Sequence, residues 1–248
     1  MPLGQSPQKK LRHADPVQSQ SATILECLNF NHGKLADVTG CLLQVGEKRK
    51  NPANSKLVVS LIVGSENCVI QVTLWNHVAE QERSLSAALS QEGDGFPVVT
   101  LKRFNVELIP DVVRLQSTPN STIAIGKPRP IVLTPEPSLF LPDFLQLEDF
   151  PSARQVHVLA IVMEIGEVRE SSASGQLLRT VCLGQRDGCY FNLEAAGLQA
   201  CDSSWEIGAT VAIFYIDICG SRAFLWADGY VHVIGKQEPP EKSRQIQW

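Results

Sequence analysis

The densest group of cations in the sequence lies in one short segment. Residues 46–56 read GEKRKNPANSK and place Lys48, Arg49, Lys50 and Lys56 around an Asn-Pro-Ala-Asn-Ser turn. Cations on a flexible loop can follow a phosphodiester backbone, which supplies most of the sequence-independent affinity of proteins for nucleic acid. The alternative is a solvated turn that keeps the surface polar, because most runs of charge have that role.

A second candidate is the tryptophan that ends the apolar run VIQVTLW, residues 69–75. If this run is a strand, its side chains alternate, and Gln71, Thr73 and Trp75 share the side opposite the aliphatic residues. A large ring on a polar face can stack on a base, which is worth about 1–3 kcal/mol per base in single-strand binders. The alternative is that Trp75 covers a neighbouring helix or the end of the sheet.

Residues with the spacing of a catalytic or metal site are not found. The seven cysteines form no C-x-x-C pair, so the commonest zinc-binding spacing is missing. The five histidines show no H-x-x-x-H or H-x-E pattern. The carboxylates Asp143, Glu148 and Asp149 have no neighbouring His or Lys to work with. We therefore expect neither an enzyme nor a bound cofactor or metal.

The elements that must position these residues are mainly strands. Runs rich in β-branched residues cover 36–46, 56–64, 68–75, 97–109 and 112–117, and turn residues separate them. The one convincing helix is expected at 76–91. The segment 126–150 contains five prolines and favours an extended linker. The predicted order in the first half is three strands, a helix and two strands.

The second half repeats this order. Residues 36–64 align with residues 156–184 without a gap, at a constant offset of 120, and Gly46, Arg49 and Gly64 each meet an identical residue. Strand-like runs at 189–193, 210–218 and 222–236 follow, with a short helix-like segment at 194–200. The same structural unit is therefore expected twice.

Five strands with a helix between the third and fourth is the order of the OB-fold, a small closed barrel. We expect a mainly all-β protein of two tandem five-stranded OB-fold barrels, each with a short helix between strands 3 and 4. The predicted parts are a disordered tail at 1–30, a first barrel at 31–125, a proline-rich linker at 126–150, a second barrel at 151–236 and a tail at 237–248. In OB-folds, oligonucleotides bind to strands 2 and 3, to the loop between strands 1 and 2 (L12) and to the loop between strands 4 and 5 (L45).

Three stretches of the first unit resemble the DNA-binding OB-folds of the replication protein A large subunit. The resemblance covers about 90 residues and rests on Ala36-Asp37-Val38, on Thr73-Leu74-Trp75, which matches the family's T-L-W motif, and on the serine-rich segment 115–122. It implies that Trp75 stacks on a base. The family's second stacking aromatic lies in the loop between strands 4 and 5, where this chain has 107–111 without an aromatic. Phe104 is the candidate substitute.

The predicted binding site belongs to the first barrel. It comprises Trp75 with its neighbours on the polar face and the cations around them, namely Gln71, Thr73, Lys48, Arg49, Lys50, Lys56, Lys102, Arg103, Phe104 and Arg114. The second unit carries six Lys and Arg against nine Asp and Glu and lacks the lysine cluster. For it we expect either weak nucleic-acid binding, through rings such as Tyr190, Tyr215, Trp226 and Tyr230, or a protein contact.

The sequence favours a single-stranded DNA-binding protein, with RNA also open as a ligand, that resembles the replication protein A large subunit and acts in replication, repair or recombination. The alternative is an OB-fold scaffold subunit that binds proteins in a telomere-end or meiotic complex, which the net charge of −4 favours. Protein subunits of a replication protein A-like complex are expected partners. No apolar run is long enough for a membrane span, and we expect a nuclear location.

Overall fold

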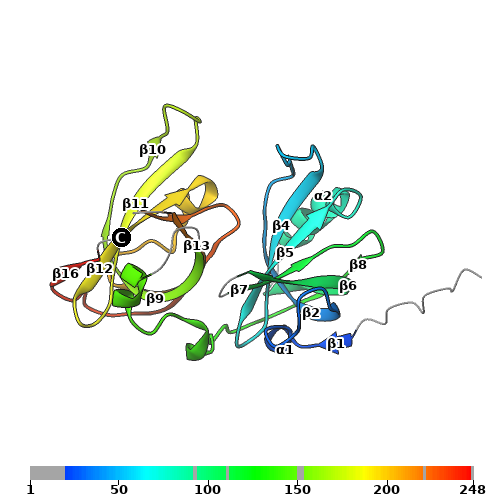
Figure 1. Cartoon of the computed structure of the whole chain (residues 1–248), viewed down its shortest axis with the longest axis horizontal. Coiled ribbons are helices and arrows are strands. Elements are labelled where there is room, and N and C mark those ends of the chain that lie inside the picture. Colours follow the sequence, from blue (N-terminus) through cyan, green and yellow to red (C-terminus); the bar gives the residue numbers. More distant parts are fainter. Residues whose placement is uncertain (1–19, 92–93, 110–111, 150–153, 220–221, 247–248) are drawn as a thin grey trace, which may run out of the picture.

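A computed structural model shows two β-barrels side by side (Figure 1). It describes residues 20–91, 94–109, 112–149, 154–219 and 222–246. Each barrel is built from one sheet of eight strands, of which five close the barrel and three are flanking strands. The prediction of two tandem OB-fold barrels is confirmed.

The first barrel closes through pairing of its first strand with its fourth and of its third with its fifth. Its five strands are β2 (Leu35–Val45), β4 (Leu57–Gly64), β5 (Val69–Trp75), β6 (Phe96–Ile109) and β7 (Val112–Gln116). β2 pairs with β4 and β6, and β7 runs parallel to β5. The flanking strands are β1 (Gln20–Ala22), β3 (Arg49–Lys50) and β8 (Thr122–Arg129). The predicted helix is a 3-10 turn, η1 (Ala79–Gln81), followed by α2 (Glu82–Leu89).

The second barrel has the same connections. Its five strands are β9 (Arg154–Ile165), β11 (Leu177–Gly184), β12 (Cys189–Ala196), β13 (Ala209–Cys219) and β14 (Arg222–Leu225). β9 pairs with β11 and β13, and β14 runs parallel to β12. The flanking strands are β10 (Arg169–Glu170), β15 (Tyr230–Lys236) and β16 (Arg244–Gln245). Its short helix is the 3-10 turn η4 (Gly197–Cys201).

The internal repeat holds at the level of single hydrogen bonds. β3 and β4 correspond to β10 and β11, and the first and last residues of both strands match at an offset of 120 residues. The amide of Gly46 donates to the carbonyl of Ser60 at 2.8 Å, and Gly166 donates to Thr180 at the same distance. The hairpin tips also match, because Ser55 and Gly175 both have positive φ, 58° and 68°. The two L12 hairpins are therefore built alike.

The offset grows by one residue in the third strand. Trp75 lies opposite Val58, whereas Ala196 lies opposite Leu178, the counterpart of Val58. The counterpart of Trp75 is therefore Ala196. An alignment of Asn192-Leu193-Glu194 with the T-L-W motif, at an offset of 119, is therefore wrong by two residues.

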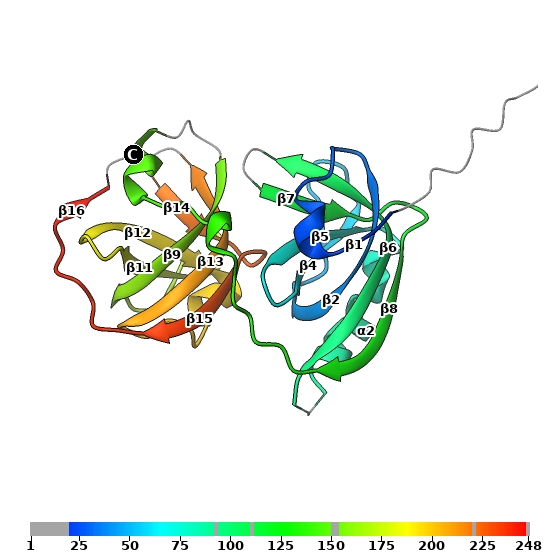
Figure 2. The same ribbon diagram turned by 90° about the horizontal axis from the view of Figure 1, so that it is seen from below.

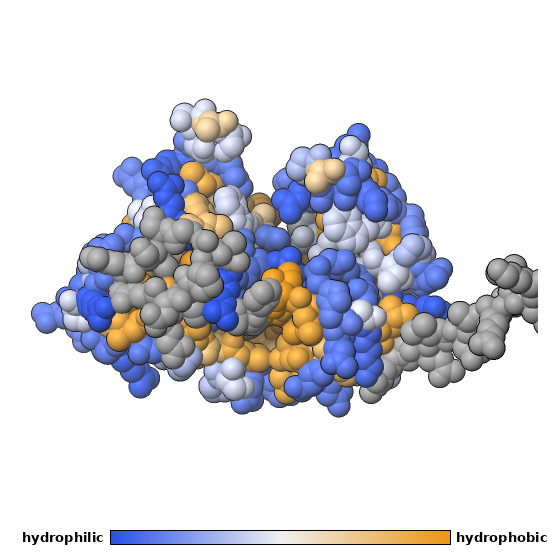
Figure 3. Space-filling model, viewed as in Figure 1, coloured by the Kyte–Doolittle hydropathy of each residue, from blue (hydrophilic) through white to orange (hydrophobic). Residues whose placement is uncertain are grey.

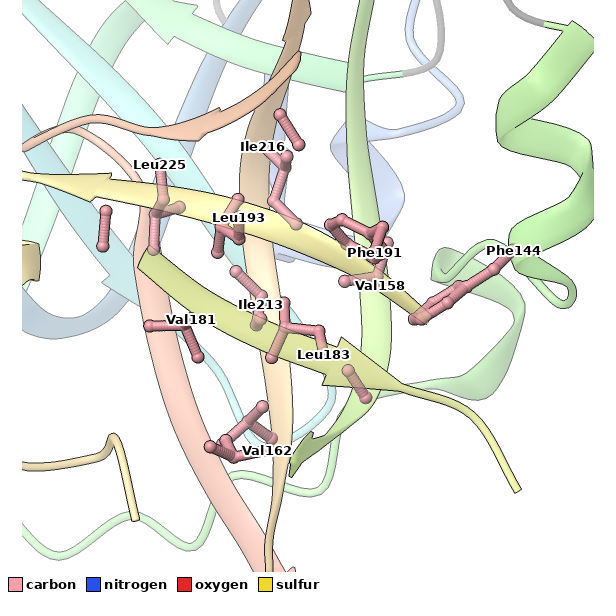
Figure 4. Packing of buried hydrophobic residues seen from close by; sticks show 14 of the residues in the cluster. Phe144, Val158, Val162, Val181, Leu183, Phe191, Leu193, Ile213, Ile216 and Leu225 are labelled. Atoms are coloured by element: carbon pink, nitrogen blue, oxygen red, sulfur yellow. The ribbon is translucent and has the colours of Figure 1, made fainter. Parts of the chain in front are cut away.

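Each barrel has its own apolar core. In the second barrel, Leu193 of β12 and Ile213 and Ile216 of β13 point into the same core (Figure 4). Phe144 in η3 (Phe144–Asp149) packs edge-on against Phe191, with ring centroids 4.8 Å apart. The end of the predicted linker therefore belongs to the core of the second barrel.

The expected tails are partly folded. β1 pairs in parallel with β2, and Ile24 and Cys27 in the short helix α1 (Ile24–Cys27) are fully buried in the first core. At the other end β16 pairs with β12, and Ile246 is buried in the second core. The prediction of tails at 1–30 and 237–248 is wrong for these residues, while 1–19 and 247–248 lie outside the described residues. The predicted domain boundaries exclude these segments because their sequences are mostly polar, and only single buried side chains anchor them to the cores.

Replacing Ile24 with alanine should lower the free energy of unfolding by about 2–5 kcal/mol, because the side chain leaves a cavity in the first core. Urea denaturation of the full chain measures the change. Val132→Ala, at a side chain that is 79% exposed, is the control. Equal stability of the two variants would show that the segment before β2 is not part of the folded unit.

Candidate nucleic-acid interface

Trp75 lies at the end of β5 in an open groove of about 360 Å³, and its side chain is partly exposed. The groove walls come from the L12 hairpin, the end of β5 and the segment after β7. They are Asn54, Lys56, Trp75, Asn76, His77, Gln116, Ser117, Thr118 and Pro119. Apart from Trp75 and Pro119, every one of these side chains is polar, so the indole ring is the main apolar surface in a polar groove.

The main chain around Trp75 is fixed by the parallel strand beside it. The amide of Trp75 donates to Oγ of Ser117 at 2.8 Å, and the amide of Ser117 donates to the carbonyl of Thr73 at 2.8 Å. Asn76 has a φ of 50°, which turns the chain sharply out of the strand. Ser117 belongs to the serine-rich segment that resembles the replication protein A family, but its contact with Trp75 was not predicted.

The loop that forms the far wall of the groove is anchored on Arg103. The carbonyl of Arg103 accepts hydrogen bonds from Ser121 Oγ at 2.7 Å and from Thr118 Oγ1 at 3.2 Å. The amide of Arg103 donates to the Asp37 carboxylate at 2.8 Å, and its φ of 60° marks an irregularity in β6. Arg103 therefore supports the groove through its main chain rather than lining it.

The predicted lysines and Arg49 lie in different surroundings. Lys56 lines the Trp75 groove, and Arg49 and Lys50 are exposed on β3. Lys48 is held by an ion pair with Glu80, 3.1 Å from Nζ to the carboxylate. Lys102 is exposed on β6 opposite β8, outside the lining of the groove.

A second groove, of about 490 Å³, lies between the barrels and joins the two L12 hairpins. From the first barrel it is lined by Gly46, Glu47, Arg49 and Ser60, and from the second by Gly175, Gln176, Leu177, Gly197, Leu198, Cys201, Ala227 and Asp228. Figure 3 shows the two hairpins standing on either side of a hollow. Arg49 therefore faces the junction of the barrels.

The prediction that Gln71 contacts a ligand is wrong. Its side chain is 1% exposed, because the second barrel covers this part of β5. The Gln71 amide donates to the hydroxyl of Tyr215 at 2.8 Å, and its side-chain nitrogen donates to the carbonyl of Asp228 at 3.1 Å. Thr73, two residues farther along, is 9% exposed. Only the Trp75 end of the polar face remains open.

Phe104 is fully buried in the first core, so its predicted role as a second stacking ring is also wrong. Val99 and Leu101 point into the core at period two, and Arg103 would be the next inward residue. The positive φ of Arg103 and the register shift opposite β2 move the inward position to Phe104. The loop residues 110–111 lie outside the described residues.

The two barrels are joined by an apolar cluster to which both barrels and the linker contribute. It comprises Cys41, Leu43, Ile62, Val69, Val112, Leu133, Phe140, Ala212, Phe214 and Tyr215. Figure 2 shows the linker running along this junction between the barrels. Tyr215 is 2% exposed, which contradicts the expectation that its ring is free to bind a strand.

His157 lies beside this cluster, with its ring 4.8 Å from Tyr215 and 5.2 Å from Phe214. Burial lowers the pKa of His157 to about 4, so the ring is neutral at pH 7. Its Nδ1 can then accept the hydrogen bond that the Tyr215 amide donates at 3.1 Å. The neutral histidine helps to hold Tyr215 in its positive-φ conformation, at 63°.

Arg114 also belongs to the junction of the barrels rather than to the open groove. Its guanidinium donates to Oε1 of Gln155 in β9. Burial raises the pKa of the Asp217 carboxyl group on β13, because it disfavours the charged form, and the side chains of Gln155 and Trp226 act against this shift. Arg114 of the first barrel therefore contacts the second barrel through Gln155.

The corresponding face of the second barrel carries no ring at the position of Trp75. Glu194 and Ala196 take the places of Thr73 and Trp75. Glu194 forms an ion pair with Arg169 at 3.2 Å, so a carboxylate lies where the first barrel has a hydroxyl. Tyr190 on the same strand lies under Lys242 from the C-terminal segment, 4.9 Å from its ring centre.

Among the described residues, no three His, Cys, Asp or Glu side chains gather closely enough to hold a metal ion. The longest α-helix in the same ranges has eight residues, short of the about 20 needed to cross a bilayer as a helix.

No protein-family model and no curated protein matches the sequence. Several solved structures are similar. A chain of a replication protein A heterotrimer bound to ssDNA matches over 83% of this chain and 49% of its own, with 14% identity and a TM-score of 0.45. The p204 HINb domain matches over 82% of this chain and 98% of its own, with 12% identity and a TM-score of 0.42. The Ifi202 HINa domain in complex with 20bp dsDNA matches over 81% and 96%, with 8% identity and a TM-score of 0.41.

These likenesses concern the fold alone. The chain spans about half the length of the replication protein A chain that it matches.

The contact between the barrels can be tested at one hydroxyl. Tyr215→Phe removes the acceptor for the Gln71 amide and the donor to the Val113 carbonyl, 3.2 Å away. Two buried polar groups then lack partners, so the free energy of unfolding should fall by about 1–3 kcal/mol. Tyr190→Phe, at a partly exposed ring, is the control. If both variants unfold at the wild-type urea midpoint, the hydroxyl does not join the barrels.

Proposed function

We propose that this protein binds single-stranded nucleic acid, with the first barrel as its main binding unit. The observation that carries the proposal is Trp75, a partly exposed ring in a polar groove whose wall includes Lys56 and which lies at the open end of strands 2 and 3. A base reaches such a ring only when it is outside a duplex stack. The ligand is therefore a single strand rather than a duplex.

The roles of the side chains follow from their positions. Trp75 offers a face on which any base can stack, which gives affinity with little sequence preference. Lys56, Arg49 and Lys50 are exposed along one hairpin and can follow the phosphates of a strand that leaves the groove. Lys48 contributes less, because Glu80 already neutralises it. Gln116 and Thr118 supply hydrogen-bonding groups at the groove wall.

The narrower role that we propose is in DNA replication, repair or recombination in the nucleus, without catalytic activity. The support for this role is the resemblance of the T-L-W strand and the serine-rich segment to the replication protein A large subunit. Binding of RNA and assembly with protein subunits of a similar complex belong to the same proposal.

A scaffold role is the second candidate, and one surface favours it. Large aliphatic side chains are exposed on the second barrel, including Leu177 at 41%, Leu198 at 55% and Ile207 at 53%. The same barrel has more acidic than basic residues. Pull-down from a nuclear extract with nuclease present separates the two candidates, since protein partners that survive digestion support the scaffold.

Trp75→Ala should weaken binding of oligo-dT by about 5- to 150-fold, the loss expected from one stacked base. Fluorescence anisotropy of a labelled oligonucleotide measures the change. Trp75→Phe keeps a ring and should lose less, while Ile207→Ala on the exposed surface of the second barrel should bind as the wild type does. Unchanged affinity of folded Trp75→Ala would contradict the proposal.

Replacing Arg49, Lys50 and Lys56 together with glutamine should flatten the salt dependence of binding. Each lost phosphate contact of a single strand removes roughly 0.7 from the slope of log K against log salt, so the expected change is about 2. The matched control replaces three exposed cations elsewhere, Arg83, Lys127 and Lys236. An equal change of slope in both triple variants would mean that net charge, not the hairpin, attracts the strand.

A further inference from the structure

The second barrel lacks a ring at the counterpart of Trp75 but carries two at the end of strand 5. Phe224 and Trp226 lie nearly parallel, 9° apart, with centroids separated by 5.1 Å. Both are partly exposed, and Leu225 between them is fully buried in the core, so the two rings point outward. Neither ring is needed to fill the barrel.

The strand register places this pair where the first barrel has its groove. Thr73 pairs with Gln116 across the parallel strands of the first barrel, and the equivalent Glu194 pairs with Phe224 in the second. Phe224 is thus the counterpart of Gln116, and two residues farther Trp226 is the counterpart of Thr118. Gln116 and Thr118 both line the Trp75 groove. The exposed aromatic residues therefore lie on strand 3 in the first barrel and at strand 5 in the second, at equivalent places on the same face.

The pair is held in place before any ligand arrives. The two rings pack against each other, and Phe224 is paired with Glu194 of β12 on one side and with Asp217 of β13 on the other. A ring fixed in this way loses little side-chain entropy when a base stacks on it. The exposed cation Arg222 precedes the pair and lines a groove of about 320 Å³ with Asn192 and Thr180.

The two aromatic surfaces lie on the two sides of one junction. Gln71, which donates to Asp228, lies four residues before Trp75 on the same side of β5, roughly 13 Å along the strand. Asp228 itself lies two residues after Trp226. Trp226 therefore lies on the second barrel beside the junction that covers Gln71.

From this arrangement we propose that Phe224 and Trp226 form a second base-stacking platform for single-stranded nucleic acid. The inference rests on the proposed function of the first barrel and extends it to a path across both barrels. The acidic second barrel then binds through ring stacking and Arg222 rather than through a lysine cluster.

Binding of two oligonucleotide lengths tests the platform. One OB-fold occupies roughly 4–16 nucleotides, so oligo-dT of about 8 residues fits one barrel and about 30 residues spans both. Phe224→Leu with Trp226→Leu should weaken binding of the long oligonucleotide at least about fivefold and leave the short one unchanged. Trp75→Ala should weaken both lengths. Ile207→Ala, at a side chain of the second barrel that is 53% exposed, is the control and should weaken neither.

Equal affinity of the folded double variant and the wild type for the long oligonucleotide would overturn the platform while leaving the proposed function intact. No binding by the wild type at either length would overturn the proposed function itself.

Crosslinking does not depend on the stability of the variants. Long oligo-dT that carries 5-iodouracil, irradiated on the wild-type chain and mapped by mass spectrometry, should crosslink to Trp75 and to Phe224 or Trp226. Crosslinks confined to the first barrel would overturn the platform.

Discussion

The packing of the second barrel against strands 2 and 3 of the first is the constraint on which the site depends. Tyr215 reaches across the junction, accepts from the Gln71 amide and donates to the Val113 carbonyl. Around it the apolar cluster covers Ile62 and Val69, which belong to the face that OB-folds use for ligands. What remains open is the upper end of that face, with Trp75 and the L12 hairpin. The junction thus decides which part of the first barrel can bind.

The same junction gives the second barrel a different role. Its strand-3 face carries Glu194 in place of a hydroxyl and Ala196 in place of the ring, and the C-terminal segment covers Tyr190. The rings of Phe224 and Trp226 lie instead at the end of strand 5, where Phe224 pairs with Asp217 of β13. Because the barrels are held together by side chains from both, the two proposed stacking sites lie on one packed unit rather than on two independent modules.

Local patterns were enough to predict the fold, but not the parts that depend on distant residues. The repeat at an offset of 120 predicted both hairpins, since turn chemistry and strand alternation are local. Gln71 was misassigned because its partners, Tyr215 and Asp228, are more than 140 residues away and a polar side chain on a strand normally faces water. Phe104 was misassigned because the positive φ of Arg103 breaks the alternation by one residue.

Hydrogen–deuterium exchange of the full chain with and without excess oligo-dT tests the central claim most directly, because it locates the ligand on the folded protein. The account predicts slower exchange in residues 49–56, at the Trp75 end of β5 and in 116–119, with no change along β8. Slower exchange along β8 and Lys102, or no change in the hairpin and at Trp75 under saturating ligand, would contradict it.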